Sequence, residues 1–520
     1  MASCVRFNLP AGWEVPPSLT VGSQSATVQR IEAISGRLTV LDTFDWRLFR
    51  EGLALYQLAS GLTLCSLGGE EAAQEPGSLA PRFAAQLPKG ELRKRLKPVA
   101  GVRALLPMAA ADYTDVRYRV LDGSQSSLAE MALLEARHTQ GPDDQAVARQ
   151  LWVWSSSGSV ALRRRLVAAL GNLGLERVKD LEDDQLYARV LEWAGQRPGS
   201  YSTQLALDLD PDMPAADAVR LVLRELLRTM QLNEPYVVED VDIEFLHDYR
   251  VALRRTRSLL AQMKHIFPPD EVQRFRQAFA ELGEQTNALR DLDVYLARQK
   301  DYTRLLPAHL RPAIAPLFDH LRSLRSEALA AVVSALTSPE HARLMAEWQA
   351  FLDQPSPDHP QATHRLLPIG VLARQRLLKR YRGMAKQAAK LARDASPQTL
   401  HALRIEGKKL RYLLEVFASL FPAKKVHNLV DHLKQLQDIL GDINDLTVQE
   451  AYLQQVAQDL PLDGVNGRNT LLAVGVLIGK LDDQREALRA QVGAALAEFT
   501  AAETAELVAE LFEQEDEEED

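Results

Sequence analysis

The sequence predicts a multidomain protein. An N-terminal α+β domain with an antiparallel sheet is followed by an all-α domain of two repeated helical bundles with pseudo-twofold symmetry. Three observations lead to this prediction. Strand-like alternation and five of the six tryptophans fall within residues 1–200. The rest of the chain is dominated by 3.6-residue apolar periodicity, which is typical of helices. One part of the helical region also resembles a part 154 residues later.

The composition is that of a globular protein in a reducing compartment. Of 520 residues, 46% are hydrophobic and 25% are charged, which is an ordinary balance. The longest apolar run, Leu471–Ile478, is much shorter than the roughly 20 residues of a membrane span. The N-terminus lacks the pattern of a secretory signal. The chain has two cysteines, Cys4 and Cys65, and one disulfide bond could not stabilise a fold of this size. We therefore expect a cytoplasmic protein without a membrane span.

Residues 1–200 are expected to form the α+β domain. Alternating or β-branched apolar residues predict four strands, at Arg37–Asp42, Leu53–Leu58, Leu62–Leu67 and Tyr113–Leu121. A helix is predicted over Val160–Leu175, with glycines near its end. The acidic, proline-containing stretch Asp208–Pro214 is typical of a linker, which we place at residues 201–214.

Residues 215–512 are predicted to be helical. A proline-rich break at Asp353–Pro360 divides them into a first repeat, about 215–352, and a second, about 361–512. The expected helices are Ala218–Leu232, Glu244–Ile266, Asp270–Gln299, Leu372–Asp394, Pro397–Phe421, Lys425–Gln458 and Asn469–Phe499. Seven of the last eight residues are acidic, so we predict a disordered tail over 513–520.

The two helical halves contain a matching segment. Leu246–Val294 aligns with Leu400–Val448 without a gap, with 13 identities in 49 positions. The identities include one histidine, two arginines and a Phe-Pro pair, and Arg254-Arg255 is matched by Lys408-Lys409. A duplicated helical unit is the simplest interpretation. Two such units are expected to bury their apolar faces against each other.

Each copy carries a histidine followed by cations at fixed spacing. At about 100° per residue, the cations at +3, +7 and +10 share an arc of roughly 80° with the histidine. The first stripe is His247, Arg250, Arg254 and Arg257, and the second stripe is His401, Arg404, Lys408 and Arg411. The neighbouring Arg255 and Lys409 point away from the stripes, and both are candidate residues as well.

A third stripe precedes the second copy. The net charge of the chain is −9, yet Leu372–Lys434 holds 15 Lys and Arg against 4 Asp and Glu. The third stripe consists of Lys379, Arg382, Lys386, Lys390 and Arg393, and no acid lies on its helix before residue 393. Like charges at these spacings repel. A bound polyanion would offset that repulsion, because arginine grips phosphate oxygens bidentately and lysine adds a compact charge.

A second interpretation needs no ligand. A basic stripe is often a solvated face or a set of salt-bridge partners. Glu415 follows Arg411 by one helical turn and could pair with it. Asp291 and Asp445 could pair with stripe arginines from a neighbouring helix. The repetition of one histidine-cation pattern at one spacing favours an anion site over this interpretation.

The stripes resemble the signature of the CHAD family, the conserved histidine α-helical domain. That signature is His-x-x-Arg-x-x-x-[Arg/Lys]-x-x-Arg, and residues 247–257 and 401–411 match it. The resemblance covers about 215–500 and implies a helical domain that binds inorganic polyphosphate in a basic channel, in proteins associated with polyphosphate or storage granules. The implied binding residues are His247, Arg250, Arg254, Arg255, Arg257, Lys379, Arg382, Lys386, Lys390, His401, Arg404, Lys408, Lys409 and Arg411.

The N-terminal part resembles a divergent CYTH, or triphosphate-tunnel, fold, through residues 42–55 and 102–107. Active members of that fold open with a Glu-x-Glu-x-Lys strand, whose acids hold a divalent metal and whose lysine holds triphosphate. The stretch near Val15–Ile34, where we expect this strand, contains no such run, and Glu14 and Glu32 lack the spacing. We therefore interpret the domain as a non-catalytic, degenerate tunnel, with no catalytic residue, metal ligand or cofactor.

The leading hypothesis is thus a polyphosphate-binding protein. Two alternatives remain open: a metal-dependent triphosphatase or polyphosphatase acting through the N-terminal domain, and a nucleic-acid-binding protein. Nucleic acid is the less favoured partner because stacking aromatics should then lie among the cations. Tyr249 and Tyr412 lie off the stripes, and the third-stripe helix has only Tyr381.

Overall fold

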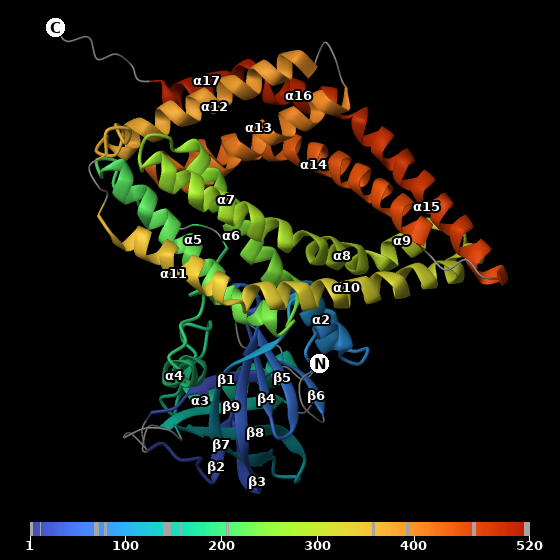
Figure 1. Ribbon diagram of the computed structural model, residues 1–520. Helices are drawn as coiled ribbons and strands as arrows, with labels where there is room; N and C mark the ends of the chain where they lie inside the picture. The colour runs from blue at the N-terminus through green and yellow to red at the C-terminus, as the bar shows by residue number, and fades with distance from the viewer. Residues whose placement is uncertain are drawn as a thin grey trace. The chain divides into compact units, whose positions relative to one another are not determined.

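The computed structural model contains two compact units, Met1–Thr203 and Gln204–Asp520. The structure describes residues 4–513 except 11, 67–71, 77–80, 139–146, 156–158, 204, 206, 356–358, 392–395 and 460–463. The predicted order, a unit with an antiparallel sheet followed by a helical unit, is confirmed (Figure 1). The predicted disordered tail beyond Glu513 lies outside the described residues.

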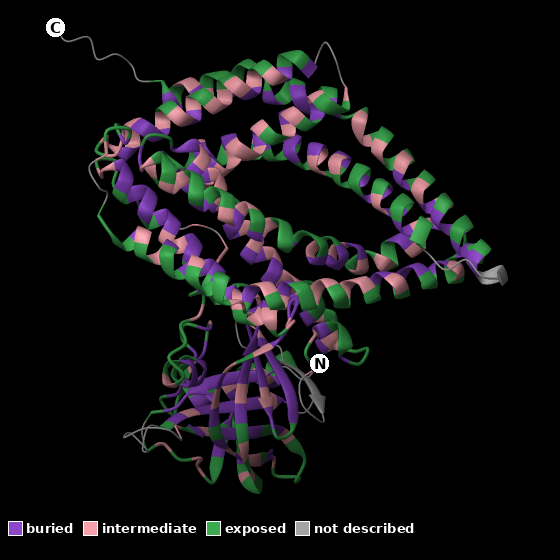
Figure 2. Ribbon diagram, in the orientation of Figure 1, coloured by how far each residue is buried: buried purple, intermediate pink, exposed green. Residues whose placement is uncertain are grey.

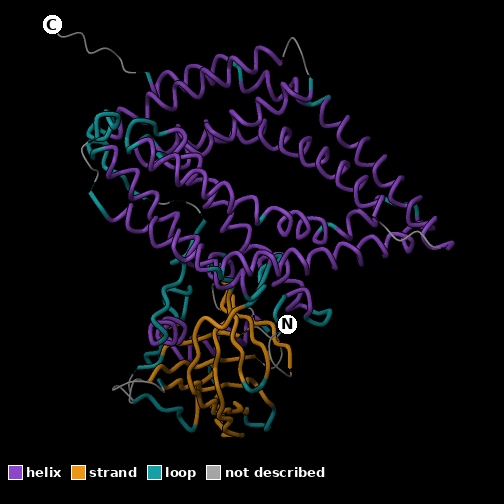
Figure 3. The backbone as a smooth tube through the Cα atoms, viewed as in Figure 1, coloured by secondary structure: helices purple, strands orange, loops and turns teal. Residues whose placement is uncertain are grey.

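The first unit is built on one curled antiparallel sheet, drawn as orange strands in Figure 3. Its strand order is β10-β1-β9-β8-β7-β3-β4-β5-β6, and β2 pairs with β3. The strands are β1 (Cys4–Asn8), β2 (Ser18–Val21), β3 (Gln24–Asp42), β4 (Leu53–Leu58), β5 (Gly61–Ser66), β6 (Ala72–Pro76), β7 (Leu106–Leu121), β8 (Ser127–Arg137), β9 (Val147–Ser155) and β10 (Glu176–Arg177). All four predicted strands lie within β3, β4, β5 and β7, apart from Leu67, which is outside the described residues.

Alternate residues of each strand face opposite sides of the sheet. Cys4 on β1 and Cys65 on β5 belong to one buried cluster and interact electrostatically. Five strands separate β1 from β5 in the sheet, so the sheet must curl for these residues to meet. The face they share is therefore the concave one. Tyr56 and Trp152 fill it with aromatic rings, whose centroids lie 5.6 Å apart.

The opening strand of the sheet is not where the sequence suggested. We expected it near Val15–Ile34, but the chain enters the sheet at β1, and residues 18–34 fall on β2 and β3. The prediction was wrong because β1 is only five residues long and too short to show a clear period. Its concave-side residues are Cys4, Arg6 and Asn8, and Arg6 forms a buried ion pair with Asp184.

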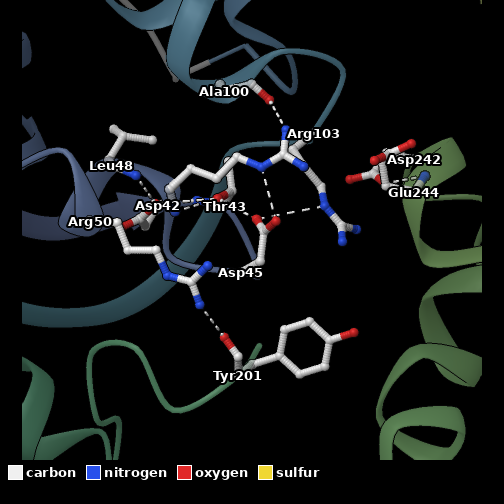
Figure 4. A network of polar contacts seen from close by, with 11 residues as sticks. Asp42, Thr43, Asp45, Leu48, Arg50, Ala100, Arg103, Tyr201, Asp242 and Glu244 are labelled. Atoms are coloured by element: carbon white, nitrogen blue, oxygen red, sulfur yellow. Dashed lines mark hydrogen bonds and ion pairs between the residues drawn. The ribbon is translucent and has the colours of Figure 1, made fainter. Parts of the chain in front are cut away.

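Four helices pack around this sheet: α1 (Arg47–Arg50), α2 (Glu91–Ala100), α3 (Val160–Gly171) and α4 (Gln185–Trp193). Helix α3 contributes to the cluster on the convex face, and α4 to the cluster on the concave face. The turn before α1 is held by carboxylates (Figure 4). Asp42 accepts hydrogen bonds from the backbone N–H groups of Thr43, Leu48 and Phe49 at 2.6–2.9 Å. Asp45 accepts one from Arg47 Nε at 2.9 Å.

The second unit is all helical in its described residues, and buried and exposed faces alternate along each helix (Figure 2). The first repeat contains α5 (Ala215–Val238), α6 (Ile243–Gln262), α7 (Pro269–Gln285), α8 (Asn287–Ala297), α9 (Gln299–Leu305), α10 (Ala315–Leu336) and α11 (Pro339–Asp353). The second contains α12 (Ile369–Leu391), α13 (Pro397–Val416), α14 (Ala423–Asp459), α15 (Gly464–Arg489), α16 (Val492–Phe499) and α17 (Ala502–Phe512).

The duplication extends well beyond the aligned 49 residues. A shift of 154 carries the first and last residues of α6 onto those of α13, and the start of α5 onto the start of α12. The same shift carries α10 onto most of α15, and α11 onto α16 and the first half of α17. Hence the repeat comprises the whole sequence of helices from residue 215, although little identity survives outside its centre.

Two long predicted helices are broken. We expected a continuous helix over Asp270–Gln299, but it is divided at Thr286 into α7 and α8, and a further break at Arg298 begins α9. The hydroxyl of Thr286 donates to the carbonyls of Leu282 and Gly283 at 3.3 and 3.0 Å, which competes with the helical pattern. The second copy has Leu440 at that position, and α14 runs through it unbroken. The predicted helix Asn469–Phe499 is likewise divided, between α15 and α16.

The two repeats share a core. Leu292 of α8 and its equivalent Leu446 of α14 lie in one buried cluster. Tyr295 and Tyr452 stack across the same junction with ring centroids 4.6 Å apart. Because equivalent residues of the two copies meet, the repeats are related as the predicted pseudo-twofold symmetry requires.

Candidate functional site

Helices α6 and α13, which carry the first and second stripes, lie against each other. Gln262 Nε2 of α6 donates to the carbonyl of Lys409 on α13 at 3.2 Å. Arg255 of α6 donates to Glu415 of α13 at 2.7 Å. Both helices begin at a capping side chain: Asp242 caps α6, and Ser396, followed by a proline, caps α13. These caps fix the start of each stripe, because the histidine follows the cap by five residues in both copies.

The two stripes meet at their middle cations. Burial, together with the charges of Arg404 and Arg254, lowers the pKa of Lys408 to about 8, and the charge of Asp445 opposes this shift. Arg254 is the equivalent of Lys408 in the first repeat, so equivalent cations from α6 and α13 act on each other. Among the described residues, no carboxylate forms an ion pair with either of them. Two unpaired cations held within electrostatic range are a costly arrangement without an anion.

Arg250 is fixed by the break between α7 and α8. Its guanidinium donates to the carbonyl of Gly283 at 2.8 Å, to Oδ1 of Asn287 at 2.6 Å and to the hydroxyl of Thr286. Burial, together with the charge of Arg254, lowers the pKa of Arg250 to about 10, and the charge of Asp291 opposes this shift. Since all three acceptors are neutral, Arg250 keeps its positive charge uncompensated by these contacts.

Carboxylates are present at one edge of the site. Arg404 lies 3.5 Å from Oδ1 of Asp445, as the salt-bridge interpretation anticipated. Asp291 is the acid of the first repeat that is equivalent to Asp445. Burial raises the pKa of Asp291, and the negative charge of Asp445 raises it as well, whereas the charges of Arg250 and Arg290 lower it. The site is therefore a cationic cluster, Arg250, Arg254, Arg404 and Lys408, with two acids beside it. We refer to these four cations as the central cluster.

Three other candidate cations already have partners. Glu415 accepts from Arg255 through Oε2 and from Arg411 through Oε1, both at 2.7 Å. Glu406 accepts from Lys409 at 2.7 Å. Glu415 thus links α6 to α13 beside the central cluster. The structure gives Arg255, Lys409 and Arg411 contacts within the fold, and leaves the central cluster as the part best placed for a ligand.

The remaining stripe residues lie at the ends. Arg257 is half-buried. The guanidinium of Arg257 lies beside Gly283, because a Cβ atom built on that glycine would lie 3.4 Å from Arg257 Nη1. Gly283 is also the residue whose carbonyl accepts from Arg250. His247 is half-buried on the second turn of α6. His401 is exposed and lines a pocket together with Arg404.

The third stripe lies on another side of its helix. Helix α12 faces α13 through Arg380, which is 3.4 Å from Glu406, and through Met384, whose Cε lies near Gly407. At about 100° per residue, the third stripe lies roughly 140° around α12 from these residues. Its cations Lys379, Arg382, Lys386 and Lys390 are exposed, and Arg382 pairs with Glu513 at 2.9 Å. Arg393, which we also assigned to this stripe, lies outside the described residues.

The pocket beside His401 brings in two cations that the sequence analysis missed, Arg485 and Arg489 of α15. The 154-residue shift aligns them with Ala331 and Ala335, so the gain of two arginines in the second repeat can be read from the sequence, beyond the segment of high identity that ends at Val448. The pocket has a volume of about 330 Å³.

Charged residues on the concave face of the first unit form ion pairs with one another. Arg117 and Asp115 of β7, on the same face as Leu134, lie 3.0 Å apart. Arg6 is neutralised by Asp184, which also accepts from Gln150 at 2.9 Å. Within the described residues, no cluster of three or more His, Cys, Asp and Glu side chains is placed to hold a metal ion. The curled antiparallel sheet is consistent with a CYTH-like tunnel.

These features define a class of protein: a duplicated helical domain with a cationic cluster where the two copies meet. A family model described as the CHAD domain matches residues 221–454. The helical unit therefore contains a CHAD domain, and the resemblance of the two stripes to that family is confirmed.

Two curated relatives match part of the chain. The uncharacterized proteins Rv2226 and MT2285, from two strains of Mycobacterium tuberculosis, are each 27% identical to the chain over 325 residues. The match covers 60% of this chain and 60% of each relative.

Two solved structures are also similar. The crystal structure of the CHAD domain from the plant Ricinus communis is 29% identical, with a TM-score of 0.48; the match covers 57% of this chain and 96% of that one. PptA from Streptomyces chartreusis is 19% identical, with a TM-score of 0.43, over 54% of this chain and 99% of that one.

In the described part of the chain, none of the helices combines the length and apolar character needed to cross a bilayer.

Proposed function

We propose that this protein binds inorganic polyphosphate at the central cluster. The observation that carries the proposal is that Arg254 and Lys408, two equivalent cations of α6 and α13, lie close enough to act on each other electrostatically, with no carboxylate ion-paired to either among the described residues. The CHAD domain supports the choice of ligand, because the family resemblance implies polyphosphate.

The arrangement suits a linear, repeating anion. Each stripe extends about 15 Å along its helix at 1.5 Å per residue. The central cluster joins the two stripes, so a chain of phosphates could contact cations from both helices in succession. Because polyphosphate carries charge at every unit, it matches a row of cations better than a single small anion does. Association with polyphosphate or storage granules in the cytoplasm is part of the same proposal and is supported by the resemblance alone.

Charge reversal at the cluster tests the proposal. The double variant R254E/K408E replaces two cations with two acids, and we expect its affinity for long-chain polyphosphate to fall at least a hundredfold at physiological salt. The matched control is R343E/K424E, which makes the same change of net charge at two exposed positions on α11 and α14. Lys424 lies 21 residues before Asp445 on α14, or about 30 Å along the helix.

The two variants are compared by calorimetric titration with polyphosphate of defined length, after circular dichroism has shown that both are folded. Equal affinities for the two variants would refute the site. Competition with single-stranded RNA and duplex DNA at the same salt distinguishes the alternative partner. Displacement of polyphosphate by nucleic acid at a lower concentration of phosphate groups would contradict the proposal.

A further inference from the structure

The two repeats differ at one place next to the proposed polyphosphate site. In the second repeat, α13, α14 and α15 enclose the pocket of about 330 Å³ that includes His401 and Arg404. Much of its wall is apolar, from Leu400, Leu440 and Ile443, all of which are buried. A site made only for bare phosphate would not be expected to have such a wall.

The pocket exists because one long side chain is missing. Asn444 lines it, and the equivalent residue of the first repeat is Arg290. Arg290 reaches across to α6, where its Nη1 donates to the carbonyl of Ile243 at 3.1 Å and lies 3.9 Å from Glu244. Ile243 is the equivalent of Pro397, which lines the pocket. The guanidinium of the first repeat thus occupies the space that asparagine leaves open in the second.

The wall of the pocket also gains charge in the second repeat. Arg485 and Arg489 stand where the first repeat has alanines. Arg485 forms ion pairs with Glu450 and Asp482, and Arg489 lies 3.2 Å from Glu486. Because acids balance these arginines, the pocket is polar at its rim without a large surplus of positive charge. The surplus of positive charge lies beside the pocket, at the central cluster.

We propose that this pocket holds the nucleoside part of a nucleoside polyphosphate, whose phosphates extend over His401 and Arg404 onto the central cluster. The proposal rests on the proposed polyphosphate site, which would receive those phosphates. The volume is at the lower end of the 300–1,000 Å³ typical of ligand pockets. The apolar wall can cover a base or sugar. The Thr447 hydroxyl donates to the Ile443 carbonyl at 2.9 Å, and the Asn444 amide nitrogen lies 3.4 Å from Asp445 Oδ1, but the oxygens of both side chains can still accept hydrogen bonds from a base or sugar.

A comparison of two ligands with equal numbers of phosphates tests this. ATP and inorganic tripolyphosphate are titrated into the full chain by calorimetry at fixed salt and without divalent cations. Tripolyphosphate carries at least as much negative charge, so electrostatics alone favours it or makes the two equal. We expect ATP to bind at least tenfold more tightly, because only ATP has a group that fills the pocket.

The variant N444R restores the residue of the first repeat and closes the pocket. In this variant the affinity for ATP should fall to the affinity for tripolyphosphate, even though the added positive charge attracts the phosphates of both ligands. The control V448R adds the same side chain on α14 at an exposed residue outside the lining, and should keep the preference for ATP.

The outcomes separate the two proposals. If long-chain polyphosphate binds at the central cluster but ATP binds no better than tripolyphosphate, the inference about the pocket is wrong and the proposed function stands. If polyphosphate does not bind, the proposed function fails. Two other results would overturn the inference. One is tighter binding of ATP than of tripolyphosphate that persists in N444R. The other is binding of palmitate, an aliphatic ligand, that N444R abolishes while ATP binds no better than tripolyphosphate.

Discussion

Lys408 should make polyphosphate binding depend on pH above neutrality. Burial and the charges of Arg404 and Arg254 lower its pKa to about 8, from 10.5 for an ordinary lysine. A bound phosphate favours the charged form and returns the pKa toward its ordinary value. Binding therefore takes up a proton, and affinity falls as the pH rises through 8.

The size of the effect follows from the fraction of Lys408 that is charged in the free protein. For a pKa of about 8, that fraction falls from about 0.76 at pH 7.5 to about 0.09 at pH 9.0, so affinity should fall at most about eightfold. Partial exposure of Lys408 and screening by salt reduce this figure. The terminal phosphates of the ligand, with a second pKa of about 6, have almost finished titrating at pH 7.5.

Calorimetric titrations with long-chain polyphosphate at pH 7.5 and 9.0, at constant ionic strength, measure the change. The control is K408R, which restores the arginine found at the equivalent position 254 and does not titrate in this range. We expect K408R to bind almost equally at both pH values. A wild-type affinity that does not change, or an equal fall in K408R, would show that Lys408 is not in contact with the phosphates.

Three further predictions concern stability, each measured on the full chain. D184A leaves the buried guanidinium of Arg6 without its partner, and should lower the free energy of unfolding of the first unit by about 3–5 kcal/mol in tryptophan-fluorescence denaturation; a loss below 1 kcal/mol would contradict it. Burial raises the pKa of Asp42 to about 6, so the folded state holds this proton more tightly than the unfolded state. Its contribution to the free energy of unfolding should therefore decrease by up to about 3 kcal/mol as pH rises from about 4 to about 6, and the difference between wild type and D42N should show this slope. R325M removes the partner of Asp293, a buried acid 2.7 Å away, and should lower the unfolding temperature of the helical unit in calorimetry, whereas R322M, at an exposed position one turn away, should have little effect.

The local features of the candidate site were evident from the sequence. The spacing of His247, Arg250 and Arg254 places them on one side of any helix they form, whatever surrounds that helix. The duplication was visible because the residues of its centre, next to the junction, have diverged least. The pairing of Glu415 with Arg411 was also foreseen, since it depends only on separation by one helical turn.

Other features depended on contacts between distant segments. No local pattern shows that Arg255 reaches Glu415 160 residues later, or that Thr286 breaks a helix where Leu440 does not. The opening strand of the sheet was misplaced for the same reason. Cys4–Asn8 is recognisable as a strand only through its pairing with β9.

The sequence by itself determined which residues share a helical face and that the helical unit is doubled, because both follow from periodicity along a single chain. Only the tertiary structure decided that Arg254 and Lys408 meet, that Arg250 is held by neutral acceptors, and that Asn444 opens a pocket that Arg290 closes. These depend on how α6, α13, α14 and α15 pack, and packing is set by the combined burial of many side chains whose positions no short sequence pattern records.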